Sequence, residues 1–286
     1  MDNATADLTF LKMHGTGNDF VVVDGRAADE RDWGDAARRL CDRHFGVGSD
    51  GLLLVLPSST ADFTMRMWNP DGSESEMCGN GIRCFGKYVY DAGLTRRREF
   101  AVDTLAGIKR LAVHSGPSGV DRVTVAMGAP ELRPERIPIA ATGDTFVDQP
   151  LRVSDQELTI TGVSMGNPHA VAYIDRPVRE YPLDRIGPLV EHDPLFPRRI
   201  NFEICNLVGP DEIDVRVWER GAGLTLACGT GACAVAVASQ IKGLVGRRVR
   251  VNLPGGSLEL EWDGQGEVMM TGPAELVFTG TWQLPL

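Results

Sequence analysis

The chain has 286 residues, a length natural for two domains, and its 43% hydrophobic and 24% charged residues are ordinary for a soluble globular protein. The net charge of −10 argues against nucleic-acid binding, and the basic triplet Arg96-Arg97-Arg98 is expected in a solvated loop. The sequence has no long apolar run, no signal-peptide pattern and no zinc-type cysteine spacing. It therefore predicts a cytosolic protein without a membrane span or structural metal, whose six cysteines stay reduced.

The first half of the chain alternates short strands with turns. Its predicted strands lie at Leu8–Lys12, Phe20–Asp24, Leu52–Leu56 and Phe63–Trp68, and near Phe100, Ile108 and Val123. A first helix is expected to be capped by Asp32 and ended by Gly46. A second, mostly buried helix is expected from about residue 81 to 90 and ended by Gly93, with Arg83 and Lys87 as its narrow polar edge.

The second half follows a Pro-rich passage at residues 130–150. Its predicted strands lie near Leu151 and at Asn201–Val208, Ile213–Trp218, Arg248–Leu253, Ser257–Trp262, Glu267–Thr271 and Ala274–Phe278, the last returning to the first half. A short helix is expected at Ile186–His192. The run Ala232–Ala238 has no charged residue, so it predicts a fully buried helix, which Gly243 ends.

A motif is repeated between the halves. Cys78-Gly79-Asn80-Gly81 matches Cys228-Gly229-Thr230-Gly231 at an offset of 150 (228 − 78), and Gly17-Asn18 matches Gly166-Asn167 at an offset of 149 (166 − 17). Several features at nearly one spacing predict an internal duplication. The expected fold class is α/β (mixed α+β), with two pseudo-symmetric domains, each a curved mixed sheet wrapped around a central helix. The expected domains are residues 1–122 with 274–286, carrying the first motif, and 123–273, carrying the second, with the active site in the cleft between them.

The repeated motif places one thiol at the start of each buried helix. Backbone N–H groups and the positive end of the helix dipole lie there, and they are expected to lower the pKa of a cysteine and to bind a carboxylate. Two such thiols facing each other would share one proton and act as base and acid on opposite faces of a small amino acid. Because no lysine stands in an evident PLP setting, we expect no cofactor.

Four motifs in order, MHGTGNDF, NPDGSESEMCGNGIRC, GNPHAV and ERGAGLTLACGTGACA, resemble the diaminopimelate epimerase family over residues 10 to about 278. The resemblance implies a cofactor-independent two-cysteine enzyme with a duplicated fold. It further implies conversion of LL-2,6-diaminopimelate to the meso form, a step towards lysine and cell-wall precursors, in the cytoplasm.

The resemblance assigns roles residue by residue. It implies Cys78 and Cys228 as the acid/base pair, Arg220 at the distal carboxylate of the substrate, and His169 and Glu219 as residues that set the thiol pKa values. The implied substrate-binding residues are Asn18, Asn69, Gly79, Asn80, Asn167, Asn201, Glu219, Arg220, Gly229 and Thr230, with no metal ligand.

Two positions depart from the family pattern. Gly51 stands where many relatives carry a substrate-contacting glutamine, and Phe278 stands where many carry a dimer-interface tyrosine. The phenylalanine ring can still pack, but the hydroxyl bond cannot form, so a homodimer stays one option among oligomeric states.

Other interpretations of the same residues stay open. A proline or hydroxyproline racemase uses a similar cysteine pair, a redox switch would join Cys78 and Cys228 in a disulfide, and an amino-acid-binding protein would bind without catalysis. The other cysteines, Cys41, Cys84, Cys205 and Cys233, are expected to pack in the core. His169 follows a proline and is expected in a turn.

Overall fold

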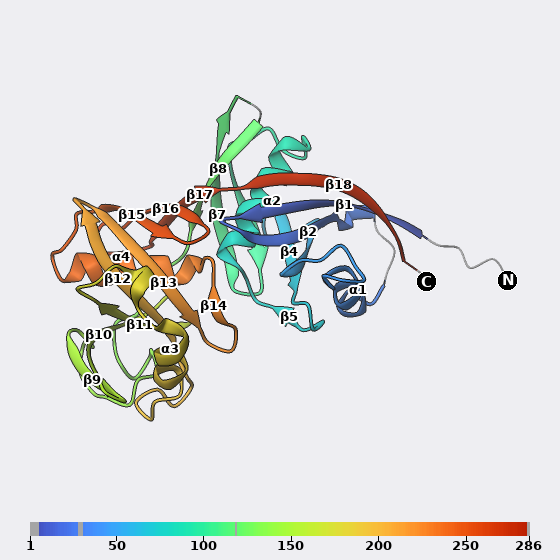
Figure 1. Ribbon diagram of the computed structural model, residues 1–286. Helices are drawn as coiled ribbons and strands as arrows, with labels where there is room; N and C mark the ends of the chain where they lie inside the picture. The colour runs from blue at the N-terminus through green and yellow to red at the C-terminus, as the bar shows by residue number, and fades with distance from the viewer. Residues whose placement is uncertain (1–5, 28–30, 118, 285–286) are drawn as a thin grey trace. The chain divides into compact units, whose positions relative to one another are not determined.

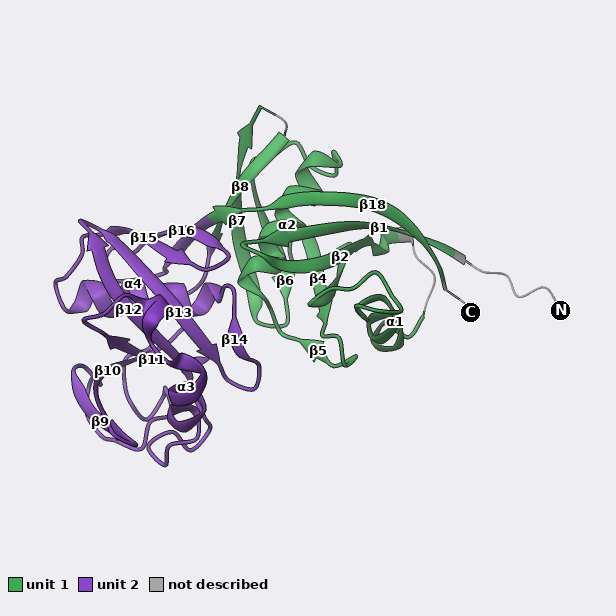
Figure 2. Cartoon of the chain, viewed as in Figure 1, with its two compact units in different colours: residues 1–125, 272–286 green, residues 126–271 purple. Residues whose placement is uncertain are grey.

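The computed structural model describes residues 6–27, 31–117 and 119–284. The chain forms two compact units, Met1–Val125 with Gly272–Leu286 (unit 1) and Ala126–Thr271 (unit 2), which Figure 2 colours green and purple. The sequence-based division placed the boundaries after residues 122 and 273. Within the described ranges, no helix is long and apolar enough to cross a membrane.

Unit 1 is a mixed sheet with two helices (Figure 1). Its hydrogen-bonded order is β18-β1-β2-β3-β4-β6-β7-β8, with β2–β3 and β4–β6 parallel and the other neighbours antiparallel. The elements are β1 (Ala6–Gly15), β2 (Asn18–Asp24), η1 (Gly25–Ala27), α1 (Trp33–Leu40), β3 (Gly51–Leu56), β4 (Phe63–Trp68), β5 (Glu74–Ser75), α2 (Gly79–Asp91), β6 (Glu99–Thr104), β7 (Gly107–Gly116), β8 (Gly119–Ala126) and β18 (Glu275–Leu284).

Unit 2 repeats this topology. Its order is β9-β10-β11-β12-β13-β15-β16-β17, with β11–β12 and β13–β15 parallel and the other neighbours antiparallel. The elements are β9 (Gln149–Val153), β10 (Gln156–Ser164), β11 (Pro168–Tyr173), η2 (Val178–Glu180), α3 (Leu183–Glu191), β12 (Asn201–Gly209), β13 (Glu212–Glu219), β14 (Gly223–Thr225), α4 (Gly229–Ile241), β15 (Arg248–Leu253), β16 (Gly256–Glu261) and β17 (Met269–Pro273). The matching order of parallel and antiparallel pairs shows the duplication in the backbone, and the predicted mixed α/β fold class is confirmed.

One helix packs against the sheet strands of each unit. α2 contacts β1, β2, β3 and β7, and α4 contacts the corresponding strands β10, β11, β12 and β16. Gly93 and Gly243 follow these helices with φ of +71° and +67°, the left-handed conformation that ends a helix at little steric penalty. α4 is apolar on all faces and buried, as predicted, but Arg83 of α2 is fully buried and does not lie on an exposed polar edge.

Three element predictions were wrong. α1 ends at Leu40 and not at Gly46, because Asp42 then accepts the N–H groups of His44 and Phe45 and closes a separate turn. The strands β10 and β11 were missed, and the turn expected around His169 is strand β11. α3 starts at Leu183, three residues earlier than predicted, and contains Pro188.

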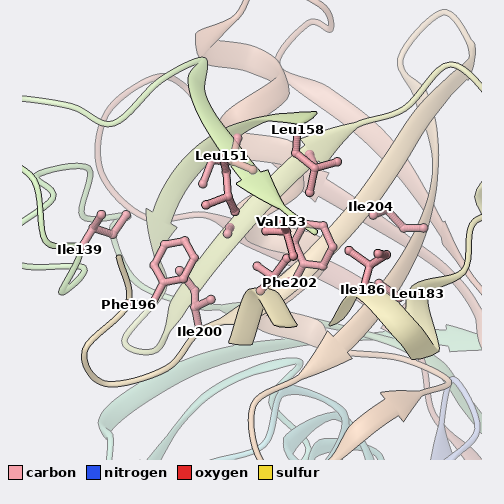
Figure 3. Packing of buried hydrophobic residues seen from close by; sticks show 14 of the residues in the cluster. Ile139, Leu151, Val153, Leu158, Leu183, Ile186, Phe196, Ile200, Phe202 and Ile204 are labelled. Carbon is pink, nitrogen blue, oxygen red and sulfur yellow. The ribbon is translucent and has the colours of Figure 1, made fainter. Parts of the chain in front are cut away.

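A separate apolar core lies beneath α3 in unit 2. Phe202 and Ile204 of β12, Leu151 of β9 and Ile186 of α3 point towards one another in Figure 3. All four are less than one-tenth exposed, so burial of apolar surface fixes this face of the sheet. The opposite face of β12 is thereby left to meet α4.

Asp19 of β2 gives unit 1 a pH-dependent contribution to stability. Burial alone would raise the pKa of Asp19, but hydrogen bonds from Arg43 and Lys12 outweigh it and lower the pKa from 3.8 to about 2. Because the folded pKa is depressed, the stabilisation is present above about pH 4 and is lost as the pH falls towards 2. Asp19→Asn is expected to lower the free energy of unfolding by about 1–2 kcal/mol at pH 7, allowing for solvent screening, and by much less near pH 2. Denaturation at both pH values measures this, with the exposed Asp144→Asn as control.

Candidate active site

Each of the two motif cysteines is the N-cap of the buried helix that follows it. Cys78 precedes α2 with φ −126° and ψ 126°, and Cys228 precedes α4 with φ −122° and ψ 113°. An extended cap followed by glycine turns the backbone N–H groups of the first helical turn outward, where the positive end of the dipole favours an anion. The two units therefore present the same local arrangement of a thiol and amide donors.

In unit 1 the structure brings three predicted residues together. The Cys78 thiol donates to Asn18 Oδ1 at 3.4 Å, and Asn80 Nδ2 donates to the same oxygen at 3.2 Å. Asn18 Nδ2 in turn donates to Asp50 Oδ2 at 2.6 Å, which fixes the amide orientation. Asn18 lies at the start of β2 and Asn80 in the first turn of α2, so the β1–β2 turn and the helix start jointly position the thiol.

Asn69 follows the end of β4, and Gly51 begins the neighbouring strand β3. Asn69 Nδ2 donates to Ser73 Oγ at 3.0 Å within the turn after β4, so its amide closes that turn. Gly51 begins β3, and a Cβ added there would lie 3.0 Å from the backbone oxygen of Trp68. A side chain at residue 51 would therefore press on the end of β4.

In unit 2 the thiol of Cys228 is held by the helix that it caps. Gly231 N donates to Cys228 Sγ at 3.4 Å, and Thr230 Oγ1 lies 3.4 Å from the same sulfur. Burial raises the pKa of Cys228 well above its usual value, and the nearby carboxyl groups of Glu219 and Glu203 raise it further. The expected lowering of the pKa by the helix start is thus outweighed at this cysteine, because the thiol is only 6% exposed.

Glu219 ends β13 close to Cys228. Burial raises its pKa, while hydrogen bonds from the Thr225 hydroxyl, at 2.5 Å, and from Cys228 lower it. Arg220 is exposed, and its backbone N–H donates to Asn201 Oδ1 at 2.9 Å. Asn201 thus holds the turn that presents the guanidinium of Arg220.

His169 is fully buried on β11. Its Nδ1 lies 2.7 Å from Glu203 Oε1 and its Nε2 lies 3.1 Å from Asn167 Oδ1. Glu203 was missed by the sequence predictions, although an acidic residue within the apolar strand NFEIC was a signal that could have been used. The buried His169–Glu203 pair lies beneath the start of α4.

The remaining groups fit structural roles. Cys84 and Cys205 are fully buried, and burial raises the pKa of Cys84 to about 12. No disulfide joins any of the six cysteines, each of which lies within the described ranges. No cluster of metal-binding side chains was found in the part of the chain that the structure describes.

Gly231 is expected to be intolerant of any side chain. A Cβ there would lie 2.7 Å from Glu203 Oε1 and 3.4 Å from Cys228 Sγ, whereas a Cβ on the equivalent Gly81 would meet Leu53 at 3.3 Å. Gly231→Ala is expected to lower the free energy of unfolding by about 1–3 kcal/mol, and Gly81→Ala by less, because a methyl group of leucine yields more readily than a buried carboxylate. Chemical denaturation of the two variants measures the difference, and equal losses would contradict it.

Comparison with known proteins assigns the chain to a family. The model of diaminopimelate epimerase matches residues 10–133 and 161–277. The chain is 50% identical over 274 residues to diaminopimelate epimerase of Acetivibrio thermocellus (96% of this chain, 98% of that protein) and 52% identical over 281 residues to that of Moorella thermoacetica (96% and 99%). The crystal structure of a hydroxyproline epimerase from Agrobacterium vitis has the same fold, with a TM-score of 0.68 at 16% identity over 96% of this chain and 91% of that one. The chain belongs to the diaminopimelate epimerase family.

Proposed function

We propose that the chain is an isomerase that interconverts LL- and meso-2,6-diaminopimelate by proton transfer at one α-carbon. Membership of the family supports the substrate and the reaction. The observation that carries the mechanism is the presence of one thiol at the start of each of the two duplicated buried helices. A symmetric pair of acid/base groups is what inversion of a stereocentre requires.

The two cysteines exchange roles with the direction of the reaction. One sulfur, as thiolate, removes the α-proton and becomes a thiol, which leaves the electron pair on the α-carbon and its carboxylate. The other sulfur, as thiol, delivers its proton to the opposite face of the carbon and becomes the thiolate. The C–H bond that breaks is replaced by one that forms, and no cofactor is consumed. The proposal requires Cys78 and Cys228 to flank the same α-carbon.

Stabilising the negative charge is the demanding part of this reaction, because an amino-acid α-proton is a very poor acid. In the proposed complex the first helical turns, at Gly79 and Asn80 and at Gly229 and Thr230, donate backbone N–H groups to the α-carboxylate. The exposed guanidinium of Arg220, whose turn Asn201 holds, binds the distal carboxylate as a bidentate donor. Asn18, Asn69, Asn167 and Glu219 are proposed further substrate contacts, and His169 is proposed to tune the thiols. The reaction would serve the cytoplasmic synthesis of lysine and cell-wall precursors.

A deuterium-exchange assay tests this function. The purified protein, without added PLP or metal, is expected to incorporate deuterium from D₂O at the α-carbon of LL-diaminopimelate and to form the meso isomer. Proline and hydroxyproline, which lack a second carboxylate for Arg220, are the matched comparison substrates and are expected to show no exchange. Tight binding of diaminopimelate without exchange would instead indicate a binding protein, and exchange with proline alone would overturn the assigned substrate.

We also propose a homodimer that uses the outer surface of β18. Leu276, Val277 and Phe278 are consecutive and about half exposed, and Phe278 packs edge-on against Phe10 with ring centroids 6.0 Å apart. Such an apolar strand is typical of an interaction surface. Sedimentation analysis is expected to show a dimer that Val277→Lys weakens, and a wild-type monomer at micromolar concentration would contradict it.

A further inference from the structure

Glu203 is a buried carboxylate that the proposed proton transfer does not use. It lies on β12 with no exposed surface, and one of its oxygens, Oε1, bonds His169 Nδ1 at 2.7 Å. The other, Oε2, is buried and has no hydrogen-bond partner among the residues that the structure describes. A half-satisfied buried carboxylate is unfavourable for folding, so its presence beside a reactive thiol calls for a reason other than stability.

The carboxylate lies against the start of α4. A Cβ on Gly231 would lie 2.7 Å from Glu203 Oε1, so only glycine leaves room for it, and the N–H of the same glycine bonds Cys228 Sγ. The charge of Glu203 and any charge on the sulfur therefore meet the same turn of helix and compete for the same dipole end. The ionisable groups that face this thiol are Glu219 from β13 and Glu203 from β12. His169 from β11 bonds Glu203, and its charge would act on Glu219 through space.

The duplicated half supplies an internal comparison. The pairing of β2 with β3 corresponds to that of β11 with β12, which places Phe20 and Leu53 where unit 2 has His169 and Glu203. A Cβ on Gly81 would accordingly meet Leu53 at 3.3 Å and Phe20 at 3.4 Å. The backbone arrangement under the two helices is the same, but an ionisable pair stands under Cys228 and an apolar pair stands in its place under α2.

We propose that Glu203 is a positioning residue of the Cys228 half: its buried carboxylate orients His169 and places a fixed negative charge at the start of α4, so that Cys228 keeps its proton in the resting protein. The inference rests on the proposed function, since it concerns the same thiol, but its test needs no substrate. The two can therefore fail separately.

The first experiment measures the pH dependence of Cys228 alkylation. Iodoacetamide labelling is followed at a series of pH values by peptide mass spectrometry that resolves Cys228 from the other five thiols. Glu203→Gln removes the charge at nearly constant volume. It is expected to lower the midpoint pH of Cys228 labelling by about one pH unit or more, which is equivalent to about tenfold faster labelling below that midpoint. Glu203→Leu, which introduces the residue that unit 1 has at the equivalent position, Leu53, is expected to lower the midpoint pH in the same way.

The matched control is Glu191→Gln. Glu191 is also a buried carboxylate of unit 2, but it bonds Trp218 Nε1 and the backbone N–H of Gly221. This variant is expected to leave the Cys228 midpoint unchanged. A folded Glu203→Gln or Glu203→Leu protein with the wild-type midpoint would overturn the proposal, as would an equal shift in the control.

The wild-type protein supplies a second test that does not depend on how the variants fold. Long-range proton–nitrogen NMR spectra, assigned with His169→Gln, report which ring nitrogen carries hydrogen. A proton on Nδ1 of His169, directed at Glu203, is expected throughout the pH range in which the protein is folded. An unprotonated Nδ1 would show that Glu203 does not orient the ring and would overturn the proposal.

Discussion

Replacing either Cys78 or Cys228 with alanine is expected to reduce epimerisation of diaminopimelate by about 10³-fold or more. A positioned general acid or base typically contributes about 10²–10⁴-fold, and inversion needs one group on each face of the carbon. Alanine at either position removes the thiol from the N-cap of its helix, and with it the group proposed to move the proton on that face. Turnover is measured by the change in optical activity or by release of the α-proton.

The chain offers a matched control for each of these variants. Cys84 and Cys233 lie six and five residues further along the same two helices (84 − 78 and 233 − 228) and are fully buried. Alanine at either position removes a thiol from the same helix without touching its start, so turnover is expected to stay within a few-fold of wild type. Wild-type turnover by both Cys78→Ala and Cys228→Ala would refute the two-cysteine mechanism, and equal losses in the controls would show that the effect comes from folding.

The largest effect on stability is expected at Arg83. Its guanidinium has no exposed surface and donates to Pro273 O at 3.0 Å, Gly79 O at 3.1 Å and Thr16 Oγ1 at 3.3 Å. Hydrogen bonds to a charged group contribute about 1.5–3 kcal/mol each, and the two carbonyl groups would be left without this donor. Arg83→Met, which keeps most of the volume, is expected to lower the free energy of unfolding of unit 1 by about 3 kcal/mol or more.

An exposed arginine of the same unit is the control for burial. It shows how much of the loss of stability expected at Arg83 depends on the burial of the guanidinium. Arg97 pairs with Asp62, but its side chain is 63% exposed. Because solvent screens such a pair, Arg97→Met is expected to lower the free energy of unfolding by less than about 1 kcal/mol. Chemical denaturation followed by circular dichroism measures both variants, and similar losses would contradict the role assigned to the buried guanidinium.

Local signals in the sequence were enough to predict the repeated framework. The Cys-Gly-x-Gly repeat located both helix starts, the glycines at 93 and 243 located both helix ends, and the strand at Arg248–Leu253 was placed to the residue. The strands β10 and β11 were missed because the glycine and proline residues between them were taken as a turn without flanking strands. The start of α3 was predicted three residues too late, and the helix has no side-chain hydrogen bond at its N-cap, Pro182, that would mark its start in the sequence.

The site was only partly predictable for a different reason. Motif spacing predicted the two cysteines as a pair at helix starts, and the family resemblance predicted the asparagines as substrate contacts. Arg83 and Glu203 could not be found in this way, since their importance comes from burial beneath the helix starts, and burial of a charge depends on strands distant in sequence. The residue types even argue against burial of these two side chains, because charged side chains are expected at the surface.

The pairing of β18 with β1 determines when the first unit can be completed during synthesis on the ribosome. The two strands run from Ala6 opposite Leu284 to His14 opposite Glu275, and β18 begins 260 residues after β1 ends (275 − 15), so it is translated after all of unit 2. Unit 2 is one uninterrupted segment, whereas unit 1 needs a segment from each side of it. At about 5–20 residues per second, synthesis leaves the edge of β1 without its partner for about 15–60 s. Until β18 is made, the backbone groups along that edge are open to pairing with a strand of another chain.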